Sequence, residues 1–527
     1  MKGTPTNTMH PTPDHGLTPG HPAERSTSTT PDLAPTPQSQ PAITTPGSLR
    51  EAWIALAGLS AVFLFEMLDN SILNVALPTI GRELQASTVA LQWVTGAYAV
   101  LFGGLMLLFG ALADRYGRRR VMLIGLALLA VASLATAAVT SAEGLILVRA
   151  LMGIAAAMTT PGSMALAFRL FTVDTLRVRA TTLISTVGLV GLALGPTIGG
   201  FVLAVAPWQV LLLANVPIAL LAMIGIRCGI AADDAADLHR DPVDLTGAIL
   251  STATIALALI APTLFVNEGA GSWLPWSFAA AAAAGAILFV RHERTTPFPL
   301  LDLNLIAQPL VSSGLAYKIA AGLATASIGY LVMLQLQLAW GWSPALAAIG
   351  MLPQVAVLIA GGAFVTPFVE RVGFTRAAWL SALAVVGGLA VYGLLSHLGY
   401  PWVALALVLT AAGLRVVGVV AAVNVLRGLP ENRTTIGAAL TDTATEVASG
   451  AGVAVAGTIL AALFTGAVTA TPWSAQQHAE FDQAVFLAGL VLTALAAALV
   501  GWGIMRSRGV ADRPASTSLA DAFGGQA

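Results

Sequence analysis

Charged residues are scarce in this chain. Asp, Glu, Lys and Arg make up 10% of its 527 residues, whereas a soluble domain typically carries about 25%. Hydrophobic residues make up 57%, which excludes an ordinary soluble protein built from several domains with polar surfaces. The formal net charge of -1 also argues against a nucleic-acid partner, which needs a basic surface. The composition therefore favours a protein that lies mostly in lipid.

Side chains that bind metals are few as well. Cys228 is the single cysteine, so the chain can form neither an internal disulfide nor a cysteine metal cluster. The seven histidines lack the spacing of metal ligands, because three lie near the amino terminus and the others are scattered. We therefore expect no metal and no cofactor.

The two ends of the chain differ from the rest. Residues 1–50 are rich in Pro, Thr and Ser and contain almost no apolar runs, a composition that cannot bury enough surface to fold. They also lack the basic start and apolar core of a signal peptide. We predict a disordered cytoplasmic tail there and a second cytoplasmic tail over residues 506–527.

Between these tails lie fourteen apolar segments, most near the length of about 20 residues that spans a bilayer. They are Trp53–Leu77, Leu91–Leu112, Val121–Val139, Leu145–Phe168, Ala180–Val205, Val210–Ile226, Leu245–Phe265, Trp276–Val290, Leu310–Leu334, Pro344–Pro367, Ala377–Leu395, Val403–Val423, Ile436–Phe464 and Phe481–Ile504. The predicted fold class is therefore an all-α integral membrane protein.

The basic residues indicate the orientation. Of the 25 Lys and Arg residues, Arg149, Lys318 and Arg415 lie inside spans, and only Arg82 lies in a loop on the side opposite the amino terminus. The others lie in the tails and in alternate loops. The positive-inside rule then places both termini in the cytoplasm of a multi-pass protein of the cytoplasmic membrane.

A short loop occurs twice at matching positions. The sequence "ADRYGRRR" follows the second span and "VERVGFTR" follows the tenth, and both contain an acid, an arginine and a glycine at the same spacing. Two repeated halves are typical of transporters. We predict a six-helix half over residues 51–228, a linker with an inserted two-helix hairpin over 229–292, and a second six-helix half over 309–505.

Four motifs resemble those of one family. "LDNSILNVALP" in the first span, "GALADRYGRRR" (Gly110–Arg120), "RALMGIAAA" (Arg149–Ala157) and "GLVGLALGPTIGG" (Gly188–Gly200) are similar to signatures of the fourteen-span drug:proton antiporters of the major facilitator superfamily. Their order and spacing agree along the chain, the tails excepted. The resemblance implies the major facilitator fold and transport of small molecules in exchange for protons, with the proton gradient as energy source. We expect a monomer in the lipid bilayer.

Charges inside the first half mark one predicted site. A charge at mid-bilayer costs roughly 2.5–3.5 kcal/mol on insertion scales, so it usually faces a cavity or a partner. Glu66 and Asp69 lie near the middle and outer half of the first span, and Arg149 of the fourth span lies at a depth close to Asp69. We predict that Asp69 and Glu66 couple transport to protons and that Arg149 modulates them.

The second half carries four more charges. Asp442 and Glu446 are four residues apart and so share a helix face, and "TDTATEVASG" around them resembles the branch that exports quaternary ammonium compounds. With Lys318 and Arg415 they form the predicted substrate-binding site, where a proton would be exchanged for a cationic drug. The alternative is a structural salt bridge to Arg415 or Lys318. Because of these two cations, anionic or zwitterionic substrates are also compatible with the predicted site.

The basic loop after the second span is a predicted gate. Its glycines allow helices to approach closely, and its aspartate can meet a helix amino terminus, so the loop can hold the two halves together on the cytoplasmic side. The residues are Gly110, Asp114, Arg115, Gly117 and Arg118. A plain positive-inside anchor is the alternative.

The fifth span carries the antiporter motif. Its glycines mostly recur at four-residue steps, which gives a smooth face for tight packing, and its proline kinks the helix. The residues are Gly191, Gly195, Pro196, Gly199 and Gly200. The resemblance implies a hinge between the halves, and packing without gating is the alternative.

Together these features predict a proton-driven exporter of drugs or toxic organic compounds that are cationic or amphipathic. Aromatic residues suited to drug binding include Trp93, Tyr98, Tyr330 and Trp340. A dedicated exporter of one endogenous metabolite or antibiotic fits the same sequence. We do not expect an enzyme or receptor, because the sequence contains no nucleophile–base set, metal motif, nucleotide loop or folded extramembrane domain.

Overall fold

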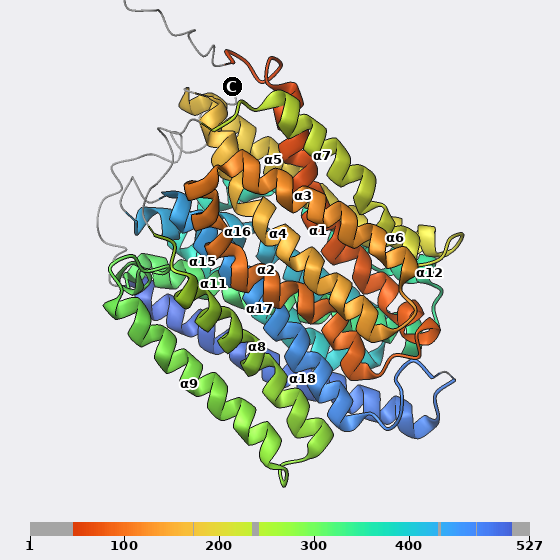
Figure 1. Ribbon diagram of the computed structural model, residues 1–527. Coiled ribbons are helices and arrows are strands. Elements are labelled where there is room, and N and C mark those ends of the chain that lie inside the picture. Colours follow the sequence, from red (N-terminus) through yellow and green to blue (C-terminus); the bar gives the residue numbers. More distant parts are fainter. Residues whose placement is uncertain (1–45, 172, 234–241, 430–433, 471, 509–527) are drawn as a thin grey trace, which may run out of the picture. The chain divides into compact units, whose positions relative to one another are not determined.

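The computed structural model describes residues 46–508 except 172, 234–241, 430–433 and 471. Throughout this part the regular secondary structure is helical (Figure 1). Most of the two predicted tails, 1–50 and 506–527, and the middle of the linker after the sixth span lie outside the described residues.

Seven helices follow one another before the linker. They are α1 (Trp53–Glu83), α2 (Thr88–Tyr116), α3 (Arg118–Ala135), α4 (Ala142–Leu170), α5 (Asp174–Leu203), α6 (Gln209–Leu213) and α7 (Asn215–Gly229), with the short turn η1 (Thr136–Ala138) after α3. The hairpin after the linker consists of α8 (Leu245–Glu268) and α9 (Trp273–Thr295).

The remaining helices begin with the short α10 (Leu303–Ile306). They continue with α11 (Pro309–Leu334), the π-helical turn η2 (Gln335–Ala339), α12 (Pro344–Gly350), α13 (Leu352–Ala360), α14 (Gly362–Val372), α15 (Phe374–Leu395), η3 (Ser396–Leu398), α16 (Tyr400–Arg427), α17 (Thr434–Leu463) and α18 (Ala475–Arg508). Within the described residues, thirteen spans are long and apolar enough to cross a membrane, and the bent pair α13–α14 makes a fourteenth. The predicted all-α membrane fold is confirmed.

Short polar residues begin several of these helices. The side chains of Ser87, Ser141 and Ser343 accept hydrogen bonds from the backbone N–H groups at the starts of α2, α4 and α12. Such caps satisfy N–H groups that have no partner within the helix. These three helices therefore start at a defined residue.

The tenth span differs from its prediction. The sequence indicated one segment, Pro344–Pro367, but the structure divides it into α12, α13 and α14, with a bend of 55° between α13 and α14. Pro353 lies in the first turn of α13, and the adjacent Gly361 and Gly362 lie at the bend. Prolines and glycine pairs are common causes of sharp kinks.

The repeated loop has the same backbone form in both halves. Gly117 joins α2 to α3 with φ +103°, and Gly373 joins α14 to α15 with φ +84°. Both angles lie in the left-handed region that glycine adopts without strain. The match between "ADRYGRRR" and "VERVGFTR" therefore reflects the same turn at the same place.

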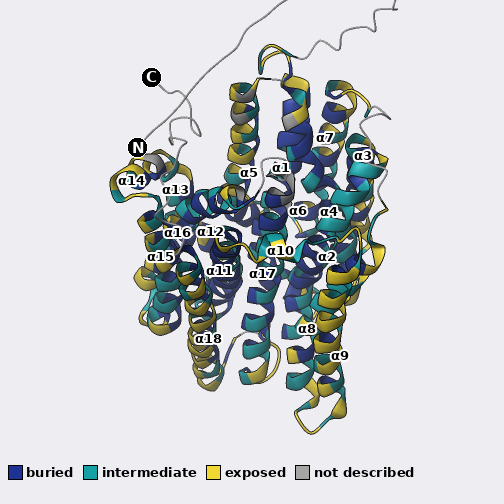
Figure 2. Ribbon diagram, turned by 90° about the vertical axis from the view of Figure 1, so that its left-hand side faces the viewer, coloured by how far each residue is buried: buried dark blue, intermediate teal, exposed yellow. Residues whose placement is uncertain are grey.

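The halves meet along a few helix pairs. α2 packs against α17, α5 packs against α12 and α13, and α1 packs against α11. Figure 2 shows α11 and α17 between the helices α13–α16 on one side and α2–α4 on the other. At one contact Gln337 Nε2 donates a hydrogen bond of 2.8 Å to the carbonyl of Val75 in α1. These contacts bring residues of both halves close together along α1, α2 and α5.

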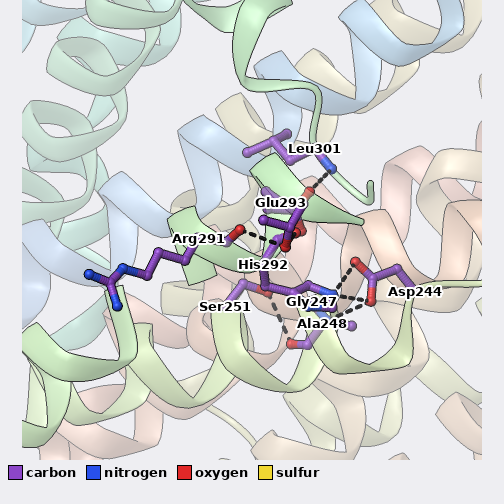
Figure 3. A network of polar contacts seen from close by, with 9 residues as sticks. Asp244, Gly247, Ala248, Ser251, Arg291, His292, Glu293 and Leu301 are labelled. Carbon is purple, nitrogen blue, oxygen red and sulfur yellow. Dashed lines mark hydrogen bonds and ion pairs between the residues drawn. The ribbon is translucent and has the colours of Figure 1, made fainter. Parts of the chain in front are cut away.

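The inserted hairpin lies over the junction of the halves. α8 packs against both α2 and α17, and α9 packs against α8 (Figure 1). α9 is mostly exposed (Figure 2). Figure 3 shows how the hairpin is held at its base: His292 Nε2 lies 2.8 Å from Asp244 Oδ1, and Glu293 Oε2 accepts a 2.8 Å hydrogen bond from the N–H of Leu301. These bonds join the start of α8, the end of α9 and the segment that leads to α11.

Candidate functional site

A buried ion pair joins α1 to α4. Asp69 and Arg149 expose 1% and 0% of their surface, and the Arg149 guanidinium pairs with Asp69 Oδ2. The other carboxylate oxygen accepts a hydrogen bond of 2.7 Å from Asn215 Nδ2 at the start of α7. Asp69 is thus bound from two other helices. The sequence placed Arg149 at the right depth but did not indicate Asn215, whose only signal is a polar residue inside an apolar span.

The remainder of Arg149 is held by α2. Its Nε donates a hydrogen bond of 3.3 Å to the carbonyl of Val94, and its guanidinium lies 4.4 Å from the ring centre of Tyr98. An arginine above a tyrosine ring gains about 0.5–2 kcal/mol. Tyr98 is fully buried, so this predicted drug contact instead supports the ion pair in this conformation.

Glu66 lies one turn before Asp69 but has different neighbours. It exposes 3% of its surface, and its Oε2 accepts a hydrogen bond of 2.7 Å from Thr160 Oγ1 in α4. No cation pairs with it within the described residues. The charged groups that act on it are Asp442 and Glu446 of α17. Glu66 is therefore an acid of the first half that faces acids of the second.

The two carboxylates of α17 lie at the contact between the halves. Glu446 is buried against Gly103 of α2, and Asp442 is half-buried. Lys318 of α11 is close enough to act on both electrostatically, although no direct ion pair joins them in the described part of the chain. Three carboxylates and one lysine therefore form a single cluster, which we call the central cluster: Glu66, Asp442, Glu446 and Lys318.

Arg415 lies apart from the central cluster. Its guanidinium rests over Gly362 at the bend between α13 and α14, and no charged group of the described residues acts on it. Of the two cations that the sequence offered as salt-bridge partners, the structure thus brings Lys318, and not Arg415, near the carboxylates.

The basic loop after α2 is bound within its own half. Asp114 pairs with Arg118 at 2.7 Å. Asp233, which follows α7, accepts a hydrogen bond of 3.0 Å from the N–H of Arg119 and pairs with Arg169 of α4 at 2.7 Å. Asp233 was not predicted, although the acidic pair at positions 233 and 234, in the linker on the same side as the basic loop, was an available signal.

The other predicted gate residues lie around the same loop. A Cβ at Gly117 would come within 2.7 Å of the Asp233 carboxylate, and Gly110 faces Pro161 of α4. The Arg115 guanidinium lies 5.6 Å from the ring centre of Tyr116. The loop is therefore packed closely, while its role as a gate stays a prediction.

Three glycines of the antiporter motif face α1. A methyl group at Gly191, Gly195 or Gly199 would meet side-chain or backbone atoms of residues 64–72. The same regular spacing that the sequence shows therefore allows α5 to lie directly on α1, in the manner of small-residue packing in membranes.

The end of the motif reaches the other half. At Gly200 a methyl group would collide with the carbonyl of Pro344 and the side chain of Ala348 in α12. Pro196 lies inside α5. Gly200 thus belongs to the contact between the halves, and hinge motion about this motif remains a prediction.

Two further predicted aromatic contacts serve packing in this conformation. Tyr330 of α11 is fully buried. Trp340 lies 5.7 Å from Trp342, which lies 5.4 Å from Tyr400. Aromatic groups at the ends of spans are typical of interface anchors.

The chain matches a known family over most of its length. The family model described as Major Facilitator Superfamily matches residues 59–453. The multidrug efflux pump LfrA of Mycolicibacterium smegmatis is 31% identical over 429 residues, which cover 80% of this chain and 84% of that protein. The methyl viologen resistance protein SmvA of Salmonella typhimurium is 29% identical over 424 residues, covering 79% and 84%.

A further relative and a solved structure are also similar to this chain. The lincomycin resistance protein of Streptomyces lincolnensis is 31% identical over 340 residues, which cover 64% of this chain and 69% of that protein. The crystal structure of a bacterial homologue of the human lysosomal transporter Spinster has a TM-score of 0.62 at 16% identity, with 89% of this chain and 100% of that chain covered. At this identity the structural likeness concerns the fold.

Proposed function

This chain belongs to the major facilitator superfamily, and we propose that it is a proton-coupled antiporter that exports drugs or other toxic organic compounds across the cytoplasmic membrane. The similarity to LfrA and SmvA, one named for multidrug efflux and one for methyl viologen resistance, supports this substrate class. The multi-pass helical fold supports a membrane location. The protein would act as a monomer on small molecules and protons.

The central cluster is the observation that carries the proposal. Glu66 comes from the first half and Asp442 and Glu446 come from the second, and the three carboxylates act on one another electrostatically near mid-span. Among the residues that the structure describes, Lys318 is the one cation that acts on any of them. Charges at this depth are costly unless they pair with a partner, line a cavity or bind a transported ion. A surplus of carboxylates can hold either protons or an organic cation, which is the competition that an antiporter requires.

The Asp69–Arg149 pair is suited to coupling. Both groups are fully removed from solvent, and Asp69 is bound from α4 and α7 at once. Protonation of Asp69 would break the ion pair and release Arg149, so a proton at this position can change how α1, α4 and α7 pack. Rocking of the halves about a site at mid-span would then expose the central cluster to each side in turn.

Transport and its energy source can be tested together. An efflux-deficient bacterial host that expresses the protein is expected to survive higher concentrations of organic cations than the same host with an empty vector. A proton uncoupler should abolish the difference, which drug accumulation measurements would report directly. Resistance to one compound alone would favour the dedicated exporter, whereas efflux that persists in the uncoupler would contradict proton coupling.

The proposed orientation has its own test. Because Cys228 is the only cysteine, its replacement by serine leaves a background in which single cysteines can be labelled. Cysteines at positions 49 and 520 should remain unlabelled by an impermeant maleimide in intact cells and react after permeabilisation, since both termini are placed in the cytoplasm. Labelling of either position in intact cells would overturn the arrangement of fourteen spans.

A further inference from the structure

Arg415 is a charged residue far inside a membrane span. It follows Tyr400, the first residue of α16, by about 22 Å at 1.5 Å per residue. A guanidinium at such a depth costs roughly 2.5–3.5 kcal/mol even on insertion scales, so it usually has a carboxylate partner or lines a water-filled cavity. The neighbours of Arg415 therefore indicate what it does.

No partner for Arg415 is found among the described residues. Its Nε is buried and makes no hydrogen bond, and no charged group of the described residues acts on its guanidinium. The cation that acts on Asp442 and Glu446 within the described part of the chain is Lys318. The terminal nitrogen of Arg415 lies over Gly362, where the absence of a side chain at the α13–α14 bend makes room for the guanidinium.

The position of Arg415 on α16 shows which way it faces. Ala411, one turn earlier on the same side of the helix, packs with Ala193 of α5 and with Val355 and Leu358 of α13. This side of α16 thus faces α13 of its own half, at the place where α13 meets α5 of the other half. Arg415 lies one turn beyond that contact, toward the cytoplasmic end of α16 in the proposed orientation, and a methyl group at Gly418 would meet nothing within 4 Å.

We propose that Arg415 binds the acidic group of the exported compound, so that the substrates include zwitterions that carry a carboxylate as well as a basic amine. This inference rests on the proposed export function. The guanidinium offers two parallel N–H donors that match the two oxygens of a carboxylate. The amine would bind at the central cluster, whose surplus of negative charge lies on α1 and α17.

This division of charge predicts a specific preference. A compound with both groups satisfies the unpaired guanidinium and the surplus carboxylates together, whereas a purely cationic compound leaves Arg415 unpaired. A charged hydrogen bond of about 1.5–3 kcal/mol corresponds to roughly tenfold or more in affinity. The free acid of an amphipathic dye should therefore bind more tightly than its ester.

A rhodamine with a free benzoate and its methyl ester form a suitable pair of probes, because they differ only in the acidic group. Fluorescence anisotropy would report the binding of each dye to the purified transporter. We expect Arg415→Gln to weaken binding of the free acid about tenfold and to leave the ester unchanged or bound more tightly. Arg415→Lys, which keeps the charge but loses the planar fork, should retain part of the preference.

The matched control is Arg427→Gln. Arg427 ends the same helix, and its guanidinium lies 4.8 Å from the ring centre of Phe374, so its removal should leave the ratio between the two dyes unchanged. Equal weakening of both dyes by Arg415→Gln, or failure of the wild-type protein to bind the free acid, would overturn the inference. The proposed function fails separately, if bound dyes are not moved by a proton gradient in vesicles.

Discussion

Replacement of Asp69 by asparagine is expected to abolish proton-driven transport and to lower the stability of the folded protein. The asparagine cannot bind and release a proton, and it leaves the buried Arg149 guanidinium without its counter-charge. Breaking a buried pair by removing one partner typically costs about 3–5 kcal/mol. Drug uptake into inverted vesicles and the melting temperature of the purified protein would measure the two effects.

A second substitution separates coupling from folding. In the double variant Asp69→Asn with Arg149→Gln no unpaired charge remains, so stability should recover to a large extent, while transport should stay absent because the proton site is still missing. Glu83→Gln is a matched control, since Glu83 lies at the exposed end of the same helix. Normal, uncoupler-sensitive transport by Asp69→Asn would remove Asp69 from the proposed mechanism.

Replacement of Glu446 by glutamine is expected to weaken the binding of organic cations at least about tenfold, with dications affected most. Two unit charges about 4 Å apart interact by roughly 4 kcal/mol at an effective dielectric of 20, and each 1.4 kcal/mol is a factor of about ten. Neutral compounds lack this interaction and should bind almost as before. Equilibrium binding of a dication, a monocation and a neutral analogue to purified protein would test the order.

The salt-bridge alternative predicts a different outcome. If Glu446 serves to balance Lys318, the cation that acts on it in the structure, then Glu446→Gln should lower the yield of folded protein and leave cation binding intact. The double variant with Lys318→Gln should then restore the yield. That combination of results would contradict a substrate site in α17. Glu83→Gln again controls for the loss of one carboxylate.

The sequence alone predicted the family and the spans, except for the division of the tenth span into three helices. In lipid every backbone polar group must be satisfied within its own helix or barrel, so each span is a long apolar run that can be recognised without its neighbours. The close packing of α5 was also predicted from its glycines, because close helix packing needs small residues at a fixed spacing. The depth of Asp69 and Arg149 followed from counting residues along α1 and α4.

The tertiary structure decided how the helices are turned and which polar groups meet. Most spans are apolar all around, so hydrophobicity does not indicate which side of a helix faces its neighbour. For this reason Asn215, Thr160 and Asp233 were recognised as partners only from the packed helices. Only the packed helices show that Lys318, and not Arg415, lies near the carboxylates of α17. A quarter turn of one helix about its axis would change such neighbours without changing any span.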